Sequence, residues 1–461
     1  MKKLVALLMV MSLMLSFGIF ASGTAETLKP LTEDPVTMRI VGVGAFSASG
    51  PDGTINAITG LEMPGYKMIV DAFNAAHPNV TLEIEAYPWD NWQASIQTAV
   101  LAGGVDVIMH GATLTALSAS LDDLIAADPA FDAQRFAYSR RRSDVFGSLD
   151  ASHITGVPVT VAPMLVLINK EILANYGVSL PANDWTWADL LEIAKACTGT
   201  DPVTGEKTYG VQFHNSHSDN EIWKNFTTIG YGIGANPTIQ YGATAKESKV
   251  TYNDENALQI WDFIAGLAEY TSPADREGVA VSDPAADLNI AIYFTEAPVA
   301  AHDNLKAAGV LDKYFPQSLP VIASGELQGK VTPYCGDSNL AISNTADNKE
   351  WAWEYIKFST SNPVALEYYI KNGGIVNNRE EYAKLNTLIP QEWVDAIGRA
   401  LAFIPDTYSP ASGMYSNNIS FGNLNATIGA GMRSLLMKTG TAQDAAAKVQ
   451  GVVDEYVASL K

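Results

Sequence analysis

Short apolar runs and amphipathic stretches alternate along the chain from residue 36 onward. Val36–Val43 is rich in strand-favouring residues, and Val80–Ala86 alternates apolar and polar side chains as a half-buried strand does. Between them, apolar residues recur at helical spacing from Tyr66 to Phe73. Trp92–Leu101 then predicts a helix and Val105–Met109 a short strand. This alternation predicts a parallel-type sheet with helices on its faces.

In such sheets, ligands bind beyond the carboxyl ends of the strands. The predicted ends carry Phe46 and Ser47, Trp89 and Asp90, and His110. We therefore predict these five residues as ligand contacts. The long polar connection 47–64 leaves the first strand, and a loop of that length at such a place is more often functional or mobile than idle.

The stretch around which the chain is organised is Gly156–Leu173. It holds two apolar runs separated by Pro163, and proline denies a sheet its hydrogen-bond donor. A buried strand that breaks and then resumes is what a crossover between two lobes would look like. Gly329–Ser343, with Pro333 inside its apolar pattern, resembles it and predicts a second crossover. We expect the function to lie between the two lobes.

The second half of the chain repeats the mixture of helix and strand patterns. Trp185–Ala196 predicts a helix with Thr186 and Asp189 as a cap pair, and Leu288–Phe294 predicts a strand. The last helix begins at Thr441 with a similar cap. Both halves therefore predict an α/β architecture.

The first residues indicate export. Two lysines precede the apolar run Leu4–Phe20, and small residues follow, which predicts a cleaved signal peptide over residues 1–25. A membrane anchor is the alternative, but the run is at the short edge of the spanning range. Cys197 and Cys335 lie far from this exit, so we expect no lipid anchor and a soluble periplasmic protein.

Composition narrows the classes of partner. Acidic residues outnumber basic ones 50 to 29, which argues against nucleic acid or an anionic membrane as a partner. With 47% hydrophobic and 17% charged residues, the chain should be globular. Two distant cysteines predict buried thiols rather than a disulfide framework. We expect a monomer.

Signals of enzyme chemistry are weak. Gly42-Val43-Gly44 follows a strand, but Ser47 stands where a dinucleotide fingerprint needs glycine. Gly336-Asp337-Ser338-Asn339 resembles the opening of some esterase motifs, yet no Asp-x-x-His follows. The chain has no Cys-x-x-Cys and no His-Glu-x-x-His. We therefore expect no catalytic residues, no metal and no cofactor.

Several short motifs occur in a fixed order over more than 350 residues. They are Phe73-Asn74 through His77-Pro78-Asn79-Val80, 102–107, Gly156-Val157-Pro158 with Ile168-Asn169-Lys170, 185–190, 341–343 with 348–358, and 438–445. In this order they resemble the maltose-binding-like extracellular solute-binding proteins of bacterial ABC importers.

The resemblance implies a two-lobe α/β periplasmic-binding-protein fold. Each lobe would be a mostly parallel sheet flanked by helices, and hinge crossovers would join the two. On this basis we place the N-terminal lobe at 36–158 and 338–385, and the C-terminal lobe at 163–333 and 390–461. A ligand would be held in the cleft and delivered to the transmembrane subunits of an ABC permease.

A sugar presents hydroxyls and weakly apolar C–H faces. Its binder needs aromatic platforms for the faces and carboxylates or amides for the hydroxyls. Three pairs of neighbouring residues combine these types, namely Trp89 with Asp90, Trp223 with Asn225, and Tyr334 with Asp337. Because single aromatics are often core residues, only their polar neighbours favour a binding role here.

Other candidates depend on the resemblance. It implies that Asp303 faces the cleft and that Tyr415 lies against the sugar, and Met164 stands in a segment where the family often has an aromatic residue. A lone histidine such as His110 is more often structural than ligand-contacting. No arginine or lysine is among these candidates, which favours a neutral ligand, a sugar or small oligosaccharide.

Two other readings stay open. The protein could be a secreted carbohydrate-active hydrolase, with Asp90 and Asp337 as its two carboxylates. It could also be a sensing subunit that docks on a receptor kinase rather than a permease.

Overall fold

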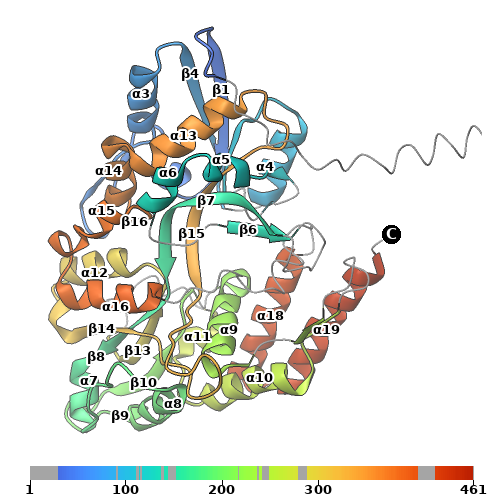
Figure 1. Ribbon diagram of the computed structural model, residues 1–461. Helices are drawn as coiled ribbons and strands as arrows, with labels where there is room; N and C mark the ends of the chain where they lie inside the picture. The colour runs from blue at the N-terminus through green and yellow to red at the C-terminus, as the bar shows by residue number, and fades with distance from the viewer. Residues whose placement is uncertain are drawn as a thin grey trace, which may run out of the picture.

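The computed structural model describes residues 30–89, 92–110, 114, 117–135, 140–143, 152–215, 218–235, 238–240, 249–278, 288–402 and 421–459. Their strands form a seven-stranded sheet and a five-stranded sheet, besides two small hairpins. Figure 1 shows each large sheet in its own half of the molecule, with β7 and β15 running between the halves. We call the half with the seven-stranded sheet the first lobe and the other half the second lobe.

The first sheet has the order β16-β7-β15-β5-β1-β4, with β6 on β7. Its strands are β1 (Val36–Gly42), β4 (Val80–Ala86), β5 (Val107–Met109), β6 (Arg140–Ser143), β7 (Ser152–Pro163), β15 (Cys335–Ile342) and β16 (Ile375–Val376). The helices of this lobe are α2 (Ala45–Ser49), α3 (Lys67–Ala76), α4 (Trp92–Leu101), α5 (Asp122–Ala126), α6 (Pro129–Gln134), α13 (Lys349–Ser361), α14 (Pro363–Lys371) and α15 (Arg379–Tyr382). The strand–helix–strand–helix–strand order predicted from residue 36 is confirmed.

The second sheet has the order β14-β8-β13-β10-β9. Its strands are β8 (Leu165–Asn169), β9 (Gly199–Thr200), β10 (Lys207–Gln212), β13 (Ile290–Thr295) and β14 (Tyr314–Ser318). Around it lie α7 (Lys170–Asn175), α8 (Trp187–Ala196), α9 (Asp219–Ile233), α10 (Glu255–Leu267), α11 (Pro273–Glu277), α12 (Pro298–Ala307), α16 (Gln391–Leu401), α18 (Phe421–Leu436) and α19 (Ala442–Ser459), with the hairpin β11 (Thr238–Gln240) and β12 (Lys249–Thr251). Within the described residues, no helix has both the length and the apolar character needed to cross a bilayer.

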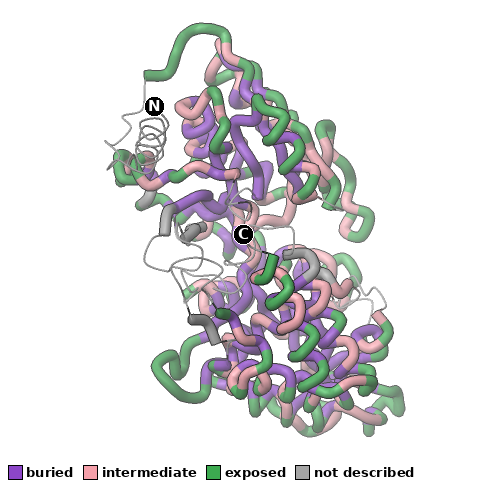
Figure 2. The backbone as a smooth tube through the Cα atoms, turned by 90° about the vertical axis from the view of Figure 1, so that its right-hand side faces the viewer, coloured by how far each residue is buried: buried purple, intermediate pink, exposed green. Residues whose placement is uncertain are grey.

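The predicted caps form as expected. Thr186 and Asp189 make a reciprocal capping box at the start of α8. Thr441 and Asp444 exchange the same pair of bonds before α19, since the Asp444 amide donates to Thr441 Oγ1 at 3.1 Å and the Thr441 amide donates to Asp444 Oδ2 at 3.2 Å. Both cysteines are buried and unbridged, and burial raises the pKa of the Cys197 thiol to about 12. Each lobe has a buried interior of its own (Figure 2).

The prediction of mostly parallel sheets is wrong. Among the described strands of the two large sheets, only the pairs β1–β4, β1–β5 and β10–β13 are parallel. The strands that pass between the lobes enter each sheet from the other lobe, so β15 runs antiparallel to β5 and β8 runs antiparallel to β13. The connection 47–64 is not one long loop. Its first three residues are the end of α2, and it also contains the hairpin of β2 (Thr54–Ile55) and β3 (Glu62–Met63).

The two predicted crossovers exist. β7 belongs to the first sheet and ends at Pro163, whereas β8 belongs to the second and begins at Leu165. The chain returns between β14 and β15 and pairs β15 antiparallel with β7, from Cys335 opposite Pro163 to Leu340 opposite Val157. The two crossing strands therefore lie side by side. A third passage between the lobes follows β16, which pairs with β7 in the first sheet. The next long helix, α16, packs on β14 of the second sheet, where Arg399 donates to Gln317 Oε1 at 3.0 Å.

Candidate functional site

The carboxyl ends of the parallel strands define one edge of the first sheet. β1, β4 and β5 run parallel, so the residues that follow them emerge together. β15 is antiparallel to β5, with Leu340 opposite Met109. The first half of β15, which starts at Cys335, therefore extends beyond that edge toward the second lobe.

The second sheet presents a matching edge. β10 and β13 are parallel, and Thr295 at the end of β13 pairs with Leu165 at the start of β8. Met164, His214 and Glu296 therefore leave the sheet at the same edge. Since both crossings enter here, the carboxyl edges of the two sheets face each other along β7 and β15.

An aromatic cluster lies at the first-lobe edge. The Trp89 ring makes edge-to-face contacts with His110 at 5.2 Å and with Trp92 at 6.0 Å between ring centroids. Trp89 is nevertheless 52% exposed. A methyl group on Gly44 would lie 3.1 Å from His110 Nε2, 3.6 Å from the Trp89 ring and 3.7 Å from Ser338 Oγ. Residues that follow β1, β4 and β5 therefore lie close together, whereas their contact with a ligand stays a prediction.

His110 has an unusual backbone conformation. Its φ of 63° lies in the left-handed region, which residues other than glycine rarely adopt. Such conformations concentrate at functional sites, where the surrounding structure holds them in place. Its amide donates to the carbonyl oxygen of Asn339 at 2.6 Å, which ties the end of β5 to the crossing strand β15.

On the second-lobe side, Met164, Trp223 and Tyr334 lie together. The rings of Trp223 and Tyr334 meet edge to face at 5.6 Å and 88°. Thr228 of α9 joins them, because its hydroxyl accepts from the Tyr334 amide at 3.3 Å and donates to Met164 Sδ at 3.5 Å. Three of the predicted contacts are thus held by one helix and the two crossings. We call Met164, Trp223, Lys224 and Tyr334 the hinge-side set.

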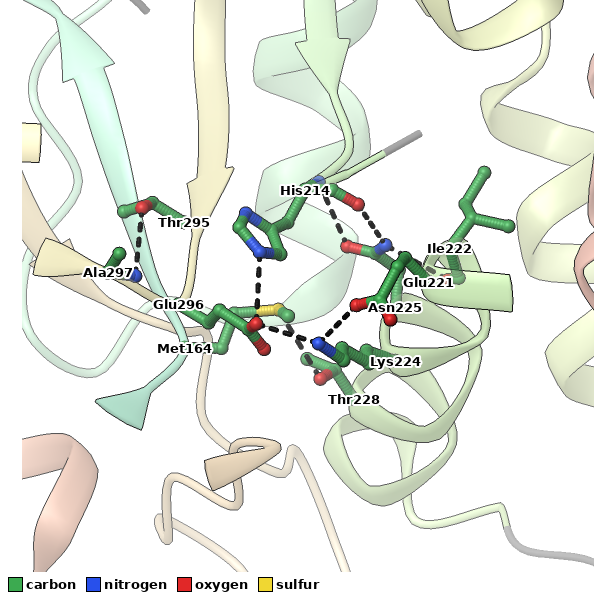
Figure 3. Close-up of polar contacts among 10 residues, drawn as sticks. All are labelled: Met164, His214, Glu221, Ile222, Lys224, Asn225, Thr228, Thr295, Glu296 and Ala297. Atoms are coloured by element: carbon green, nitrogen blue, oxygen red, sulfur yellow. Dashed lines mark hydrogen bonds and ion pairs between the residues drawn. The ribbon is translucent and has the colours of Figure 1, made fainter. Parts of the chain in front are cut away.

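A cluster of charged residues surrounds Lys224 (Figure 3). Its Nζ lies 2.7 Å from Glu296 Oε1 and also pairs with Glu221, one turn earlier on α9. His214 Nε2 lies 3.3 Å from the same Glu296 oxygen. The Lys224 ammonium also lies 5.6 Å from the centre of the Tyr334 ring.

The charges in this cluster stabilise each other. Burial alone would disfavour the ionised Glu296, but the neighbouring Lys224 and His214 outweigh it and hold the pKa of this carboxyl well below its usual range. Burial likewise opposes the Lys224 ammonium, yet Glu296, Tyr334 and Glu221 together raise the pKa of Lys224. Glu296 and Lys224 therefore form a largely buried ion pair, with side chains 17% and 13% exposed.

Sequence reasoning missed this cluster. Glu296 follows an apolar strand directly, which is the same signal that singled out His110. Lys224 follows Trp223 and stands three residues after Glu221, a spacing that brings two side chains together on a helix. Asn225 was predicted as the polar neighbour of Trp223 in the site, but it is fully buried. Its side-chain amide accepts from the His214 backbone N–H and donates to the His214 carbonyl oxygen.

Phe46 is not an accessible ligand contact. Its ring is 0% exposed and packs against Tyr66 at 6.0 Å and Tyr368 at 6.5 Å. The reason is that α2 begins directly after β1 and turns Phe46 inward. Ser47 uses its hydroxyl locally, donating to the Gly44 carbonyl oxygen at 3.1 Å.

Two of the three aspartate candidates have partners of their own. Asp303 Oδ1 lies 2.9 Å from His302 Nδ1, and the His302 ring contacts Trp393 of α16 at 5.2 Å. Asp337 Oδ1 accepts from Asn339 Nδ2 at 3.2 Å. Asp90 and Tyr415 lie outside the described residues. The described part of the chain contains no group of three histidine, cysteine, aspartate or glutamate residues that could hold a metal ion.

Solved structures share this fold at low sequence identity. The sugar-binding protein MalE from Xanthomonas citri matches with a TM-score of 0.67 and 16% identity, over 92% of this chain and 97% of that one. The substrate-binding protein Lmo0181 from Listeria monocytogenes, in complex with cycloalternan, matches with 0.66 and 16%, over 92% and 100%. A solute-binding protein from Agrobacterium radiobacter K84, in complex with ribitol, matches with 0.64 and 14%, over 92% and 100%. These similarities establish the two-lobe fold.

Sequence comparison adds a relative and a family. A protein described as an uncharacterised lipoprotein in the oleD 5′ region of Streptomyces antibioticus is 26% identical over 140 residues. That match spans 29% of this chain and only 30% of the relative's length. The family model for bacterial extracellular solute-binding proteins matches residues 59–366. Since that match covers more than half of the chain, the protein belongs to the family of bacterial extracellular solute-binding proteins.

Proposed function

We propose that this protein captures a sugar or small oligosaccharide between its lobes and delivers it to the transmembrane subunits of an ABC permease. The observation that carries the proposal is the pair of aromatic groups at facing sheet edges, Trp89 with His110 on one side and Trp223 with Tyr334 on the other. Aromatic rings suit the weakly apolar faces of sugar rings. The sugar ligands named for similar structures agree with this chemistry.

The spacing of the two groups fits a small carbohydrate. Tyr334 and Ser338 are four residues apart on the extended crossing segment, and Ser338 Oγ lies at the first-lobe cluster. At the rise of a strand this is about 13 Å. A ligand of one to a few sugar rings can therefore touch both groups, and its contacts with both would favour closure of the lobes.

The two crossings support a division of the chain into two lobes. We propose lobes at 36–158 with 338–385 and at 163–333 with 390–461, so that β7, β15 and the segment after β16 act as the hinge. We also propose a monomer that works in the periplasm without a lipid anchor. The intact mass of the exported protein tests the last point, because an acylated N-terminus would overturn it.

A thermal-shift screen tests the main proposal. Purified protein would be heated with D-mannitol, D-tagatose, ribitol and maltose, and with longer oligosaccharides. A ligand at 100 times its Kd stabilises the folded state by about 2.7 kcal/mol, which raises the Tm measurably. Small-angle scattering should then show a smaller radius of gyration with the ligand that shifts Tm. No shift with any carbohydrate would contradict the proposal.

We propose a binding role rather than hydrolysis. Asp337 is hydrogen-bonded to Asn339, and the ionised Glu296 is paired with Lys224, so neither is arranged as a proton donor. Incubation with an oligosaccharide panel and an assay for new reducing ends tests this reading. Enzymatic release of reducing ends would replace it with the hydrolase alternative.

A further inference from the structure

The charge of Lys224 is more than balanced by its neighbours. Glu296 Oε1 lies 2.7 Å from Nζ, and Glu221 forms a second ion pair with the same ammonium. An ammonium has three N–H donors, and two of them are directed to these carboxylates. The hinge-side set therefore includes a lysine, but the two glutamates paired with it carry two negative charges against its one positive charge.

This charged arrangement lies beside the aromatic rings. Lys224 follows Trp223 on α9, and its ammonium lies 5.6 Å from the Tyr334 ring centre. Glu296 directly follows β13 and Met164 directly precedes β8, and the adjoining strand residues Thr295 and Leu165 are paired. Because the side chains of Lys224 and Glu296 are largely buried, their charges are weakly screened by solvent.

These charges affect two kinds of ligand differently. A hydroxyl group can accept from the lysine and donate to a carboxylate oxygen, so an uncharged polyol suits the cluster. A ligand carboxylate also needs a cation, but near Lys224 it would meet two carboxylates that already hold that cation. Like-charge repulsion is a common means of rejecting a near-identical ligand.

We propose that Lys224, Glu221 and Glu296 form a charge filter for the sugar site, which accepts an uncharged polyhydroxylated ligand and rejects the same ligand bearing a carboxylate. In this filter Lys224 contacts the ligand, and the two glutamates are positioning residues that neutralise and orient it. The inference rests on the proposed function and narrows its ligand class.

Matched ligand pairs provide the test. D-mannitol is compared with D-mannonate and maltitol with maltobionate, since the members of each pair differ only in a terminal CH2OH group against a carboxylate. Affinities are measured by titration calorimetry, and the ratio of acid Kd to neutral Kd is the readout. We expect the wild-type protein to bind the neutral member at least tenfold more tightly.

Two variants shift the filter in opposite directions. Glu221→Gln removes one negative charge from a carboxylate that is 39% exposed, so this variant should fold. The ratio of acid Kd to neutral Kd in this variant should be at least threefold lower than in the wild type. Lys224→Met leaves the two carboxylates without their cation, so its ratio should rise. Lys313→Met is the matched control, because it breaks a surface pair with Glu171, and its ratio should equal that of the wild type.

The outcomes separate the inference from the proposed function. If the wild type binds acid and neutral members equally, or the acid more tightly, the filter is overturned while sugar binding stands. An unchanged ratio in Glu221→Gln overturns it as well, even if Lys224→Met fails to fold. If none of the neutral or acidic probes binds, the sugar-binding proposal is contradicted, and so is the charge filter that rests on it.

Discussion

Met164 donates its backbone N–H to the carbonyl oxygen of Tyr334 at 2.8 Å, and this bond joins the two crossings between the lobes. Met164 lies between β7 and β8, and Tyr334 immediately precedes β15. The Tyr334 ring, which contacts Trp223, is therefore carried by the hinge itself. We expect rotation about β7 and β15 to change the distance between this ring and Trp89 in the first lobe.

Replacement of Trp89 by alanine should weaken ligand binding with little effect on folding. The ring is 52% exposed at the end of β4, so its removal empties little of the core. If it stacks on a sugar, the loss of affinity should be about 1–3 kcal/mol. Calorimetry with the ligand found in the thermal-shift screen measures this. Leu101→Ala removes another exposed apolar side chain, 72% exposed, and should leave the affinity unchanged.

Replacement of Trp223 by alanine should affect both binding and stability. The ring is only 8% exposed and packs on Tyr334, so its loss should lower the free energy of unfolding by about 3 kcal/mol or more. The affinity should also fall by about 1–3 kcal/mol if the exposed part of the ring contacts the ligand. Urea unfolding and calorimetry separate the two effects. Unchanged affinity in both tryptophan variants would remove the platform hypothesis.

Local sequence signals predicted most of the elements but not their pairing. The helical spacing from Tyr66 and the capping pair at Thr186 act within one or two turns, so the helices that they predict appear in the structure. The direction of a strand in a sheet depends on how the chain returns from the other lobe. That is a long-range property, and the antiparallel entry of β15 beside β5 could not be read from either segment alone.

The candidate site shows the same limit. Trp89 and His110 come together because each comes shortly after the end of a parallel strand, which a pattern can show. Lys224 and Glu296 are 72 positions apart and meet only through the packing of α9 against the end of β13. Phe46 had the same local signal as Trp89, but α2 turned it into the core. A position after a predicted strand therefore identifies candidate ligand-binding residues, but tertiary packing decides which of these side chains is accessible to a ligand.

Replacement of Glu296 by glutamine should change the pH dependence of stability. The pKa of Glu296 in the folded protein lies below its ordinary value of 4.5, because Lys224 and His214 outweigh the effect of burial. The ion pair therefore contributes stability above about pH 4.5, which is lost as the pH falls further toward the folded pKa. At pH 7 the variant should be about 3 kcal/mol less stable.

Urea unfolding at several pH values tests this expectation. Carboxyl groups are protonated over roughly pH 5 to pH 3. Over this range the free energy of unfolding should fall less in the variant than in the wild type. Glu326→Gln removes the same charge from an exposed turn and serves as the control. Parallel stability curves for the wild type and Glu296→Gln would contradict the assigned pairing.

Replacement of Gly232 by alanine should destabilise the second lobe. A Cβ atom there would lie 2.0 Å from the Trp187 indole nitrogen, so α9 and α8 could not keep their present separation. Overpacking of this kind costs about 1–3 kcal/mol. Gly266→Ala is the matched control in α10, where a Cβ would meet nothing within 4 Å, and helix propensity predicts a gain of up to about 1 kcal/mol. Thermal unfolding of both variants measures the difference.

Replacement of Gly44 by alanine tests whether the first-lobe edge receives the ligand. Gly44 has a φ of +75°, and a Cβ atom there would lie 3.1 Å from His110 Nε2 and 3.6 Å from the Trp89 ring. The added methyl would therefore push the His110 ring by a few tenths of an ångström beside Trp89, besides straining the backbone. We expect a loss of stability of about 1–3 kcal/mol from the strain and at least a tenfold loss of ligand affinity.

Gly60→Ala separates these two effects. Gly60 has a nearly equal φ of +70°, but a Cβ atom there would meet nothing within 4 Å. It should therefore show the loss of stability without the loss of affinity. Affinity is measured by calorimetry at a temperature where both variants are folded, and stability by urea unfolding. If Gly44→Ala binds the ligand as tightly as Gly60→Ala, the ligand does not use the edge formed by Trp89 and His110, and the site would have to lie on the second-lobe side alone.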